Sequence, residues 1–258
     1  MLKKGANKAI YYCFLIFVCS ACSDLESDSA INISDEFLID MYQILDQTSF
    51  ELILELATDE QFDCSNYQIR VDRAKRGNSI ELVINNILEP EVCDGEIGPA
   101  TKEIKFSEQD LDQRIKFFFT DEIFDEADLI HDASKVELNL LSNNGIKFFI
   151  NELTKIPANT ITLLFEYNTP IEEIVIQEHL IDLTEVLQPT DLLSGYYGYF
   201  SVTDRKINAK ESIYALSQGA HFDLTDLNDA ELDNFENHVA RIQESLSDDL
   251  NLRLYRAY

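Results

Sequence analysis

Two stretches of acidic side chains are the residues whose type and spacing could bind a metal ion. They cover residues 121–132 and 223–229. Carboxylate oxygens suit Ca²⁺, and extracellular calcium sites can be weak, with dissociation constants of about 10⁻⁴–10⁻³ M. Neither stretch has the alternating acidic loop of an EF-hand, so solvated acidic loops are the plainer interpretation, and we expect neither a metal nor another cofactor. The weak calcium candidates are Asp121, Asp125, Asp128, Asp226 and Asp229.

Spacings typical of catalysis are absent from the sequence. The chain has no nucleophile-elbow, dinucleotide-binding, P-loop or zincin motif. Its four histidines lie far apart, and none is at metal-ligand spacing from another. Carboxylate pairs could hydrolyse glycosidic bonds, but among 48 acidic residues any such pair is expected by chance. The sequence therefore identifies no catalytic residue.

An aromatic run at residues 196–200, Tyr-Tyr-Gly-Tyr-Phe, could form a stacking platform for sugars. Alternation along a strand would instead direct some of these rings into a core, and the chain has no Trp. We therefore interpret the run as a core strand.

The N-terminus has the pattern of a secretory signal. Lys3, Lys4 and Lys8 form a basic leader, and residues 9–18 form an apolar run of ten. A membrane span needs about 20 apolar residues, whereas a signal-peptide core needs only about 7–15. The alternative, a buried first helix, is disfavoured because the run has no amphipathic period and polar residues follow it.

The end of this segment resembles the lipobox of bacterial lipoproteins, in which small residues precede a cysteine that is lipidated. Ser20-Ala21-Cys22 matches the last three positions, while Cys19 stands where Leu is usual. Residues 22–28, Cys-Ser-Asp-Leu-Glu-Ser-Asp, are also similar to the acidic export tags of surface lipoproteins of Bacteroidota. The resemblance implies a signal peptide at 1–21, lipidation at Cys22, and a lipid anchor in the bacterial outer membrane or at the cell surface.

Cysteine counting then predicts one disulfide. Cys13 and Cys19 leave with the signal and Cys22 takes the lipid, which leaves Cys64 and Cys93. An oxidising compartment favours pairing of these two thiols. Two unrelated buried thiols are the alternative.

The charge of the chain excludes one class of partner. The net charge is −28, and removing residues 1–21 takes away three basic residues and no acidic one, which leaves −31. Such a chain repels phosphate backbones, so we expect no nucleic-acid partner. It also repels anionic headgroups, so acyl chains must hold it to the membrane.

The elements that would position these residues fall into two parts after an acidic tether at 22–34. A short helix is expected to begin at Ser34, with Phe37 and Met41 on one face. Apolar residues then alternate in eight segments between Ser49 and Asn168, which predicts an antiparallel β-sandwich or open barrel within a β-rich domain at 35–168. Asn144-Gly145 predicts a hairpin between two of these strands.

The last part, 169–258, is expected to form an α/β unit. Residues 171–187 are ambiguous between strand and helix, and residues 211–216 suggest a short helix. Asn228 and Glu231 form a capping box before apolar residues spaced by three and four, which predicts a helix. Residues 250–258 alternate as a strand. The predicted class is α+β, mainly β, with a C-terminal strand–helix–strand unit.

These observations favour an envelope-anchored lipoprotein that acts as a binding or assembly module. Its expected partners are the membrane, through the lipid anchor, and an envelope protein or extracellular polymer. The alternative is an extracellular hydrolase acting on glycan or peptide. A third possibility, a solute-binding component of an uptake system, requires a ligand-sized cleft.

Overall fold

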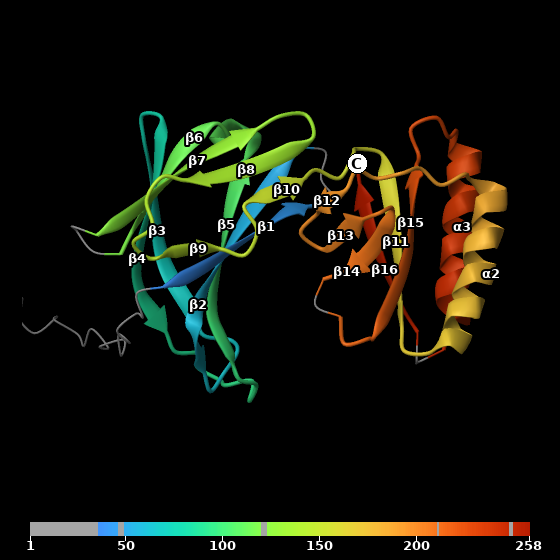
Figure 1. Ribbon diagram of the computed structural model, residues 1–258, viewed down its shortest axis with the longest axis horizontal. Coiled ribbons are helices and arrows are strands. Elements are labelled where there is room, and N and C mark those ends of the chain that lie inside the picture. Colours follow the sequence, from blue (N-terminus) through green and yellow to red (C-terminus); the bar gives the residue numbers. More distant parts are fainter. Residues whose placement is uncertain (1–35, 46–48, 120–122, 211, 248–249) are drawn as a thin grey trace, which may run out of the picture.

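Ten strands of the N-terminal part form one curled sheet (Figure 1). The computed structural model describes residues 36–45, 49–119, 123–210, 212–247 and 250–258. The strand order is β10-β8-β7-β6-β4-β3-β5-β2-β1-β9, and the pairs β3/β5, β4/β6 and β1/β9 are parallel. The strands are β1 (Phe37–Ile44), β2 (Glu51–Phe62), β3 (Gln68–Arg76), β4 (Ser79–Leu88), β5 (Gly98–Ser107), β6 (Gln113–Phe118), β7 (Phe124–His131), β8 (Lys135–Leu140), β9 (Ile146–Phe148) and β10 (Glu152–Thr154), with a 3₁₀ turn, η1 (Glu108–Asp110), before β6. The open-barrel expectation is confirmed.

One face of the curled sheet carries the core. Leu52, Leu54 and Leu56 of β2 are fully buried, and Ile80 and Leu82 of β4 are buried in the same cluster. Because successive side chains of a strand point to opposite faces, each strand directs one of its two sets of residues inward. The alternation in the sequence therefore reflects a sheet with one covered face.

The first element is a strand, not the helix expected from Ser34. Phe37, Ile39 and Met41 are buried on one face of β1, and β1 pairs antiparallel with β2 along its whole length. The spacing of Phe37 and Met41 fits both the helical period of 3.6 residues and the strand period of two, but the position of Ile39 fits only the strand period. The segment forms a strand because β2 supplies hydrogen-bond partners for the backbone N–H and C=O groups of β1.

The segment from β9 to β10 connects the two ends of the sheet. β9 pairs parallel with β1, whereas β10 pairs antiparallel with β8. Between them, the amide of Phe149 donates to the carbonyl of Ile39. The predicted hairpin at Asn144-Gly145 is therefore wrong: β8 does not pair with β9, and neither turn residue has a positive φ.

The predicted disulfide is present. Cys64 follows β2 and Cys93 lies between β4 and β5, with their Cα atoms 5.3 Å apart. This distance lies within the range that an S–S bond can span. The bond ties two connections at the same end of the sheet.

The C-terminal part is built around β11 (Thr160–Tyr167), which is buried at all eight positions. β11 lies between β15 (Leu216–Asp223) and β16 (Asn251–Ala257) and is antiparallel to both. The sequence placed this strand with the N-terminal sheet, which is wrong. A strand covered on both faces needs a layer on each side, and only the C-terminal part supplies them.

Two helices cover one face of this sheet and a small sheet covers the other (Figure 1). The helices are α2 (Pro170–Val186) and α3 (Asp229–Ser245); the small sheet has β12 (Gly195–Tyr196), β13 (Phe200–Thr203) and β14 (Lys206–Ala209). Capping boxes start both helices, at Thr169/Glu172 and at Asn228/Glu231. The helix predicted after Asn228 and the closing strand are confirmed as α3 and β16. The strand before this helix is β15, which the sequence did not predict, because the expected strand at 196–202 belongs to the small sheet. The expected helix at 211–216 is wrong, because described residues 212–215 are not helical and Leu216 starts β15.

Candidate functional site

The acidic candidates for calcium are used in different ways. Asp121 lies outside the described residues, as does Cys22. Asp128 pairs with Arg114, whose Nε lies 2.9 Å from a carboxylate oxygen, while Asp226 and Asp229 are at the start of the α3 region. Among the described residues, no group of three or more His, Cys, Asp or Glu side chains is placed to hold a metal ion.

Asp125 has a structural role that the sequence did not reveal. Its fully buried carboxylate accepts hydrogen bonds from the backbone amides of Asn144, Gly145 and Ile146, at 2.7–2.8 Å. Burial raises the pKa of Asp125, but these amides and the Ser142 hydroxyl outweigh that effect and hold it below its usual value. The carboxylate thus shapes the turn that directs β9 toward β1.

Other buried titratable groups also have structural partners. The ring of His221 lies 2.9 Å from the Thr162 hydroxyl, and burial lowers the pKa of His221 to about 4. The buried carboxylate of Glu166 accepts from Arg253 at 2.7 Å and from Asn251 at 2.6 Å. These groups lie on neighbouring strands of one sheet. Both bonds to Glu166 reach its Oε2, while its buried Oε1 has no hydrogen-bond partner among the described residues.

The aromatic run at 196–200 belongs to the core, but it forms the turn between β12 and β13 and not the single strand that was expected, and it joins the two parts of the molecule. Tyr196, Tyr197 and Phe200 are buried. The hydroxyl of Tyr196 donates to the carboxylate of Asp40 on β1 at 2.8 Å, and Tyr199 donates to the carbonyl of Gln43 at 2.7 Å. The run therefore fixes the small sheet against β1.

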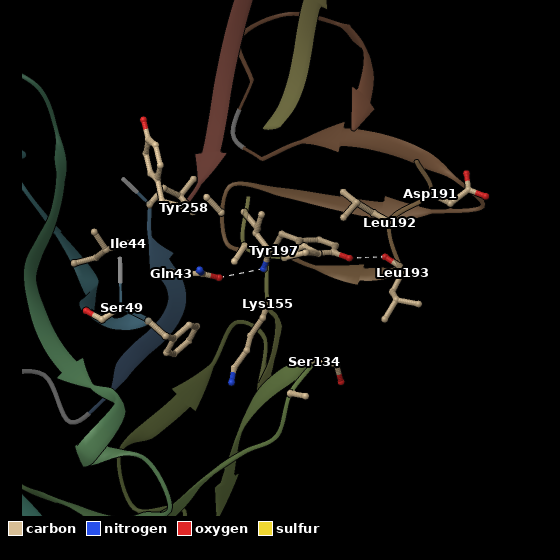
Figure 2. Close-up of a pocket in the computed structure, with 17 residues that line it drawn as sticks. Gln43, Ile44, Ser49, Ser134, Lys155, Asp191, Leu192, Leu193, Tyr197 and Tyr258 are labelled. Atoms are coloured by element: carbon tan, nitrogen blue, oxygen red, sulfur yellow. Dashed lines mark hydrogen bonds between the residues drawn. The ribbon is translucent and has the colours of Figure 1, made fainter. Parts of the chain in front are cut away.

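A pocket lies at this junction (Figure 2). Its volume is about 410 Å³, toward the lower end of the range of roughly 300–1,000 Å³ that is common for ligand sites. The end of β1, the residues before β2, the β7–β8 connection, the segment after β10, the segment before β12 and residues 257–258 form its walls. The residues that matter for its chemistry are Gln43, Phe50, Lys155, Leu192, Leu193 and Tyr197.

Hydrogen bonds order two walls of the pocket (Figure 2). The side-chain oxygen of Gln43 accepts from the amide of Ile156 at 3.1 Å. The Tyr197 hydroxyl donates to the carbonyl of Leu193 at 2.8 Å, which holds the segment carrying Leu192 and Leu193. The cavity is thus partly preorganised, with an apolar side and few polar groups.

Lys155 is the cation of the pocket. Its Nζ donates to the carbonyl of Asp132 at 2.5 Å and lies 4.6 Å from the centre of the Phe50 ring. In the described part of the chain, no carboxylate lies within salt-bridge distance of this ammonium. Burial lowers the pKa of Lys155, against the opposing effect of Asp132, Glu108 and Asp112.

A second candidate surface is the outer side of α2. Ile171, Ile174 and Ile181 are 76%, 60% and 59% exposed, and Val175 is 38% exposed. At 3.6 residues per turn these four positions fall within an arc of about 120°. Glu178 and Asp182 project from the same arc, so this face combines apolar and acidic groups.

Comparisons with known proteins add no relative: no family model, curated protein or solved structure matches the chain. Neither helix of the described residues is long and apolar enough to cross a membrane. Any function of the pocket or of the α2 face is therefore inferred from the geometry of that site alone. The sequence predicted neither site, because the pocket residues come from several segments that lie far apart in the chain, and the residues of α2 were ambiguous between strand and helix.

Proposed function

We propose that this protein is an envelope-anchored binding module whose α2 face docks a basic, apolar segment of another envelope protein. The exposed isoleucines of α2 carry the proposal. Helices of soluble proteins usually turn their apolar side chains toward a core, and contiguous exposed apolar groups often mark an interaction surface. Ile176 and Leu183 do face the core, so the exposed set is additional to what folding requires.

Covering this face would contribute part of the free energy that is needed to hold a partner. Burying one isoleucine side chain contributes about 1.5–3 kcal/mol. Ile171, Ile174 and Ile181 together therefore offer several kcal/mol, against which the cost of association must be set. Stable binding then requires a further contribution from charge.

The charge around the face specifies the partner. α2 has five acidic residues and neither Lys nor Arg, and α3 beside it has five acidic residues and one Arg. Like charges across an interface are unfavourable, so the partner must present Lys or Arg around an apolar stripe. This charge complementarity also predicts weaker binding as salt rises.

Anchoring follows from the lipobox-like segment. A lipid at Cys22 and a tether at 22–34 would keep the folded part near the membrane. The twelve residues after Cys22, 23–34, reach at most about 40 Å at roughly 3.3–3.6 Å per residue. A partner would therefore lie in or near the same membrane, in the outer membrane or at the cell surface.

The test uses paired serine variants and a defined probe. Ile171→Ser with Ile174→Ser removes the apolar face, and Val92→Ser with Ile97→Ser is the matched control, because Val92 and Ile97 are 78% and 77% exposed in the β4–β5 connection. A synthetic amphipathic peptide of Lys and Leu is titrated at low and high salt, beside its Glu–Leu counterpart. We expect at least about tenfold weaker binding of the Lys–Leu peptide to the α2 variant only.

A second arm identifies the native partner. A photo-crosslinking amino acid at position 178, in the centre of the face, is compared with one at position 91 in intact cells. A partner captured only from position 178, with a basic amphipathic segment at the crosslink, supports the proposal. Equal peptide binding by both serine variants, or no preference for the basic peptide, contradicts it.

A further inference from the structure

We propose that the junction pocket binds a small organic carboxylate with an apolar body, whose carboxylate meets Lys155. The inference is independent of docking at α2, since it depends on other residues at the opposite end of the C-terminal part. It starts from the shape of the site, a cavity of about 410 Å³ between the curled sheet and the small sheet.

The apolar side of the pocket selects the body of the ligand. Leu192 and Leu193 line it together with the ring of Tyr197. The bond from the Tyr197 hydroxyl to the Leu193 carbonyl satisfies two polar groups of this wall. An alkyl chain or an aromatic ring can therefore be covered there without leaving these two groups unpaired.

Gln43 and Lys155 are the donors with spare capacity in the pocket, whereas the one side-chain carboxylate of its lining, that of Asp191, is largely exposed and lies 3.5 Å from Arg205. Gln43 commits its side-chain oxygen to the amide of Ile156, and no described residue accepts from its Nε2. The ammonium of Lys155 donates one hydrogen bond to the carbonyl of Asp132 and has at least one further N–H that can donate. Two donors with spare capacity in one cavity favour a ligand that accepts, and the ammonium favours an anion.

Of the three acidic residues that act on Lys155 from beyond salt-bridge distance, Asp132, Glu108 and Asp112, the first and the last have other partners. The carboxylate of Asp132 accepts from the amides of Ser134 and Lys135 at 2.7 and 2.9 Å, and that of Asp112 lies 3.0 Å from the ring of His131. In a chain with 48 acidic and 20 basic residues, a half-buried lysine without a carboxylate partner among the described residues is unusual. A carboxylate supplied by the ligand would restore the ammonium's preference for its charged form.

The probes are octanoate, octylammonium and octanamide, which share a chain and differ in the head group. Calorimetric titration of the purified full-length protein should show saturable binding of octanoate and at least about tenfold weaker binding of the other two. Binding should not weaken as salt rises, because salt screens the repulsion between the acidic protein and the anion, while the partly buried contact is screened less. This dependence is opposite to that expected at α2.

Variants locate the site. Lys155→Met should weaken octanoate binding by at least about tenfold, and Leu193→Ser should weaken all chain-bearing probes. Lys135→Met is the matched control, because Lys135 is of similar exposure but pairs with Glu137 and Glu152. Far-UV circular dichroism verifies that each variant is folded.

A direct reading comes from the lysine itself. In protein labelled with ε-¹³C-lysine, which leaves the ammonium unmodified, the resonance absent from Lys155→Met identifies this residue, and octanoate should shift it and raise its titration midpoint. Equal affinity for octanoate and octylammonium, unchanged affinity in Lys155→Met, or no saturable binding overturns the proposal. None of these outcomes bears on the peptide test at α2, so the two ideas can fail separately.

Discussion

Replacing Asp125 by Ala should remove a large share of the stability of the protein. The backbone amides of Asn144, Gly145 and Ile146 would lose the buried acceptor that they share. A buried donor left without a partner costs about 1–3 kcal/mol. Because the turn can relax in part, we expect the free energy of unfolding to fall by about 3–5 kcal/mol, out of the roughly 5–15 kcal/mol of a typical domain.

Two further variants separate charge from shape. Asp125→Asn keeps one acceptor oxygen but removes the charge, so it should cost roughly 1–2 kcal/mol, the difference between charged and neutral hydrogen bonds. Asp128→Ala is the matched control on β7, since its pair with Arg114 is exposed on the sheet surface and such pairs contribute about 0–1 kcal/mol.

The pH dependence has a definite sign. The pKa of Asp125 is lowered in the folded state because the turn amides outweigh the opposing effect of burial. Its contribution is therefore fully present above the unfolded pKa, about 3.9, and is lost as the pH falls through the lower folded value. The difference between wild type and Asp125→Asn should be largest at neutral pH and shrink below about pH 4.

The assay is urea unfolding followed by far-UV circular dichroism at neutral and acidic pH, since the chain has no Trp. Hydrogen exchange adds a local reading, because faster exchange in Asp125→Ala should be concentrated at residues 144–149, which connect to β1. A loss below about 1 kcal/mol in Asp125→Ala at neutral pH, or the same loss at acidic pH, would refute the reasoning.

Three further changes test other parts of the fold. Arg253→Met should lower the free energy of unfolding in urea by about 3–5 kcal/mol, because it leaves the fully buried carboxylate of Glu166 without its cation. Glu166→Gln should lower it less, since the half-exposed Arg253 can reach water. A larger loss in Glu166→Gln than in Arg253→Met would contradict this reasoning. Cys64→Ser with Cys93→Ser opens a loop of sequence separation 29 and should cost about 3–4 kcal/mol; two free thiols in peptide maps of the wild type would contradict the bond. Cys22→Ala should move the protein from the membrane to the soluble fraction, and a wild type without an acyl group in mass spectra would rule out lipidation.

Local patterns were sufficient for most elements. Alternation located β2, β4 and β6, because each has one buried face and the side-chain period of a strand is two. The capping box at Asn228 and the spacing that followed located α3, because both signals lie within a few residues. Counting the cysteines gave the correct disulfide, since the lipobox-like segment left only one pair.

Three errors share one physical cause. Residues 37–44 fitted two periods, Asn144-Gly145 fitted a hairpin, and residues 160–167 fitted the preceding run of strands. In each case the residues that bind the segment lie elsewhere in the chain. β2 pairs with β1, the carboxylate of Asp125 binds the turn at 144–146, and β15 and β16 pair with β11. Local sequence reports the preference of a segment and not which neighbour will satisfy it.

The sequence by itself therefore determined the mainly β class, the positions of most strands and the cysteine pairing, because these depend on composition and on near neighbours. The location of the protein stays a prediction from the lipobox-like segment. Only the tertiary structure decided the pairing order of the strands and the two candidate sites. Gln43 ends one strand, Lys155 follows another and Leu193 precedes a third, so no local pattern marks the pocket. The exposed isoleucines of α2 differ from core residues only because no other described element covers them. Function at such sites depends on which surfaces remain after packing, and packing is settled by contacts between distant segments.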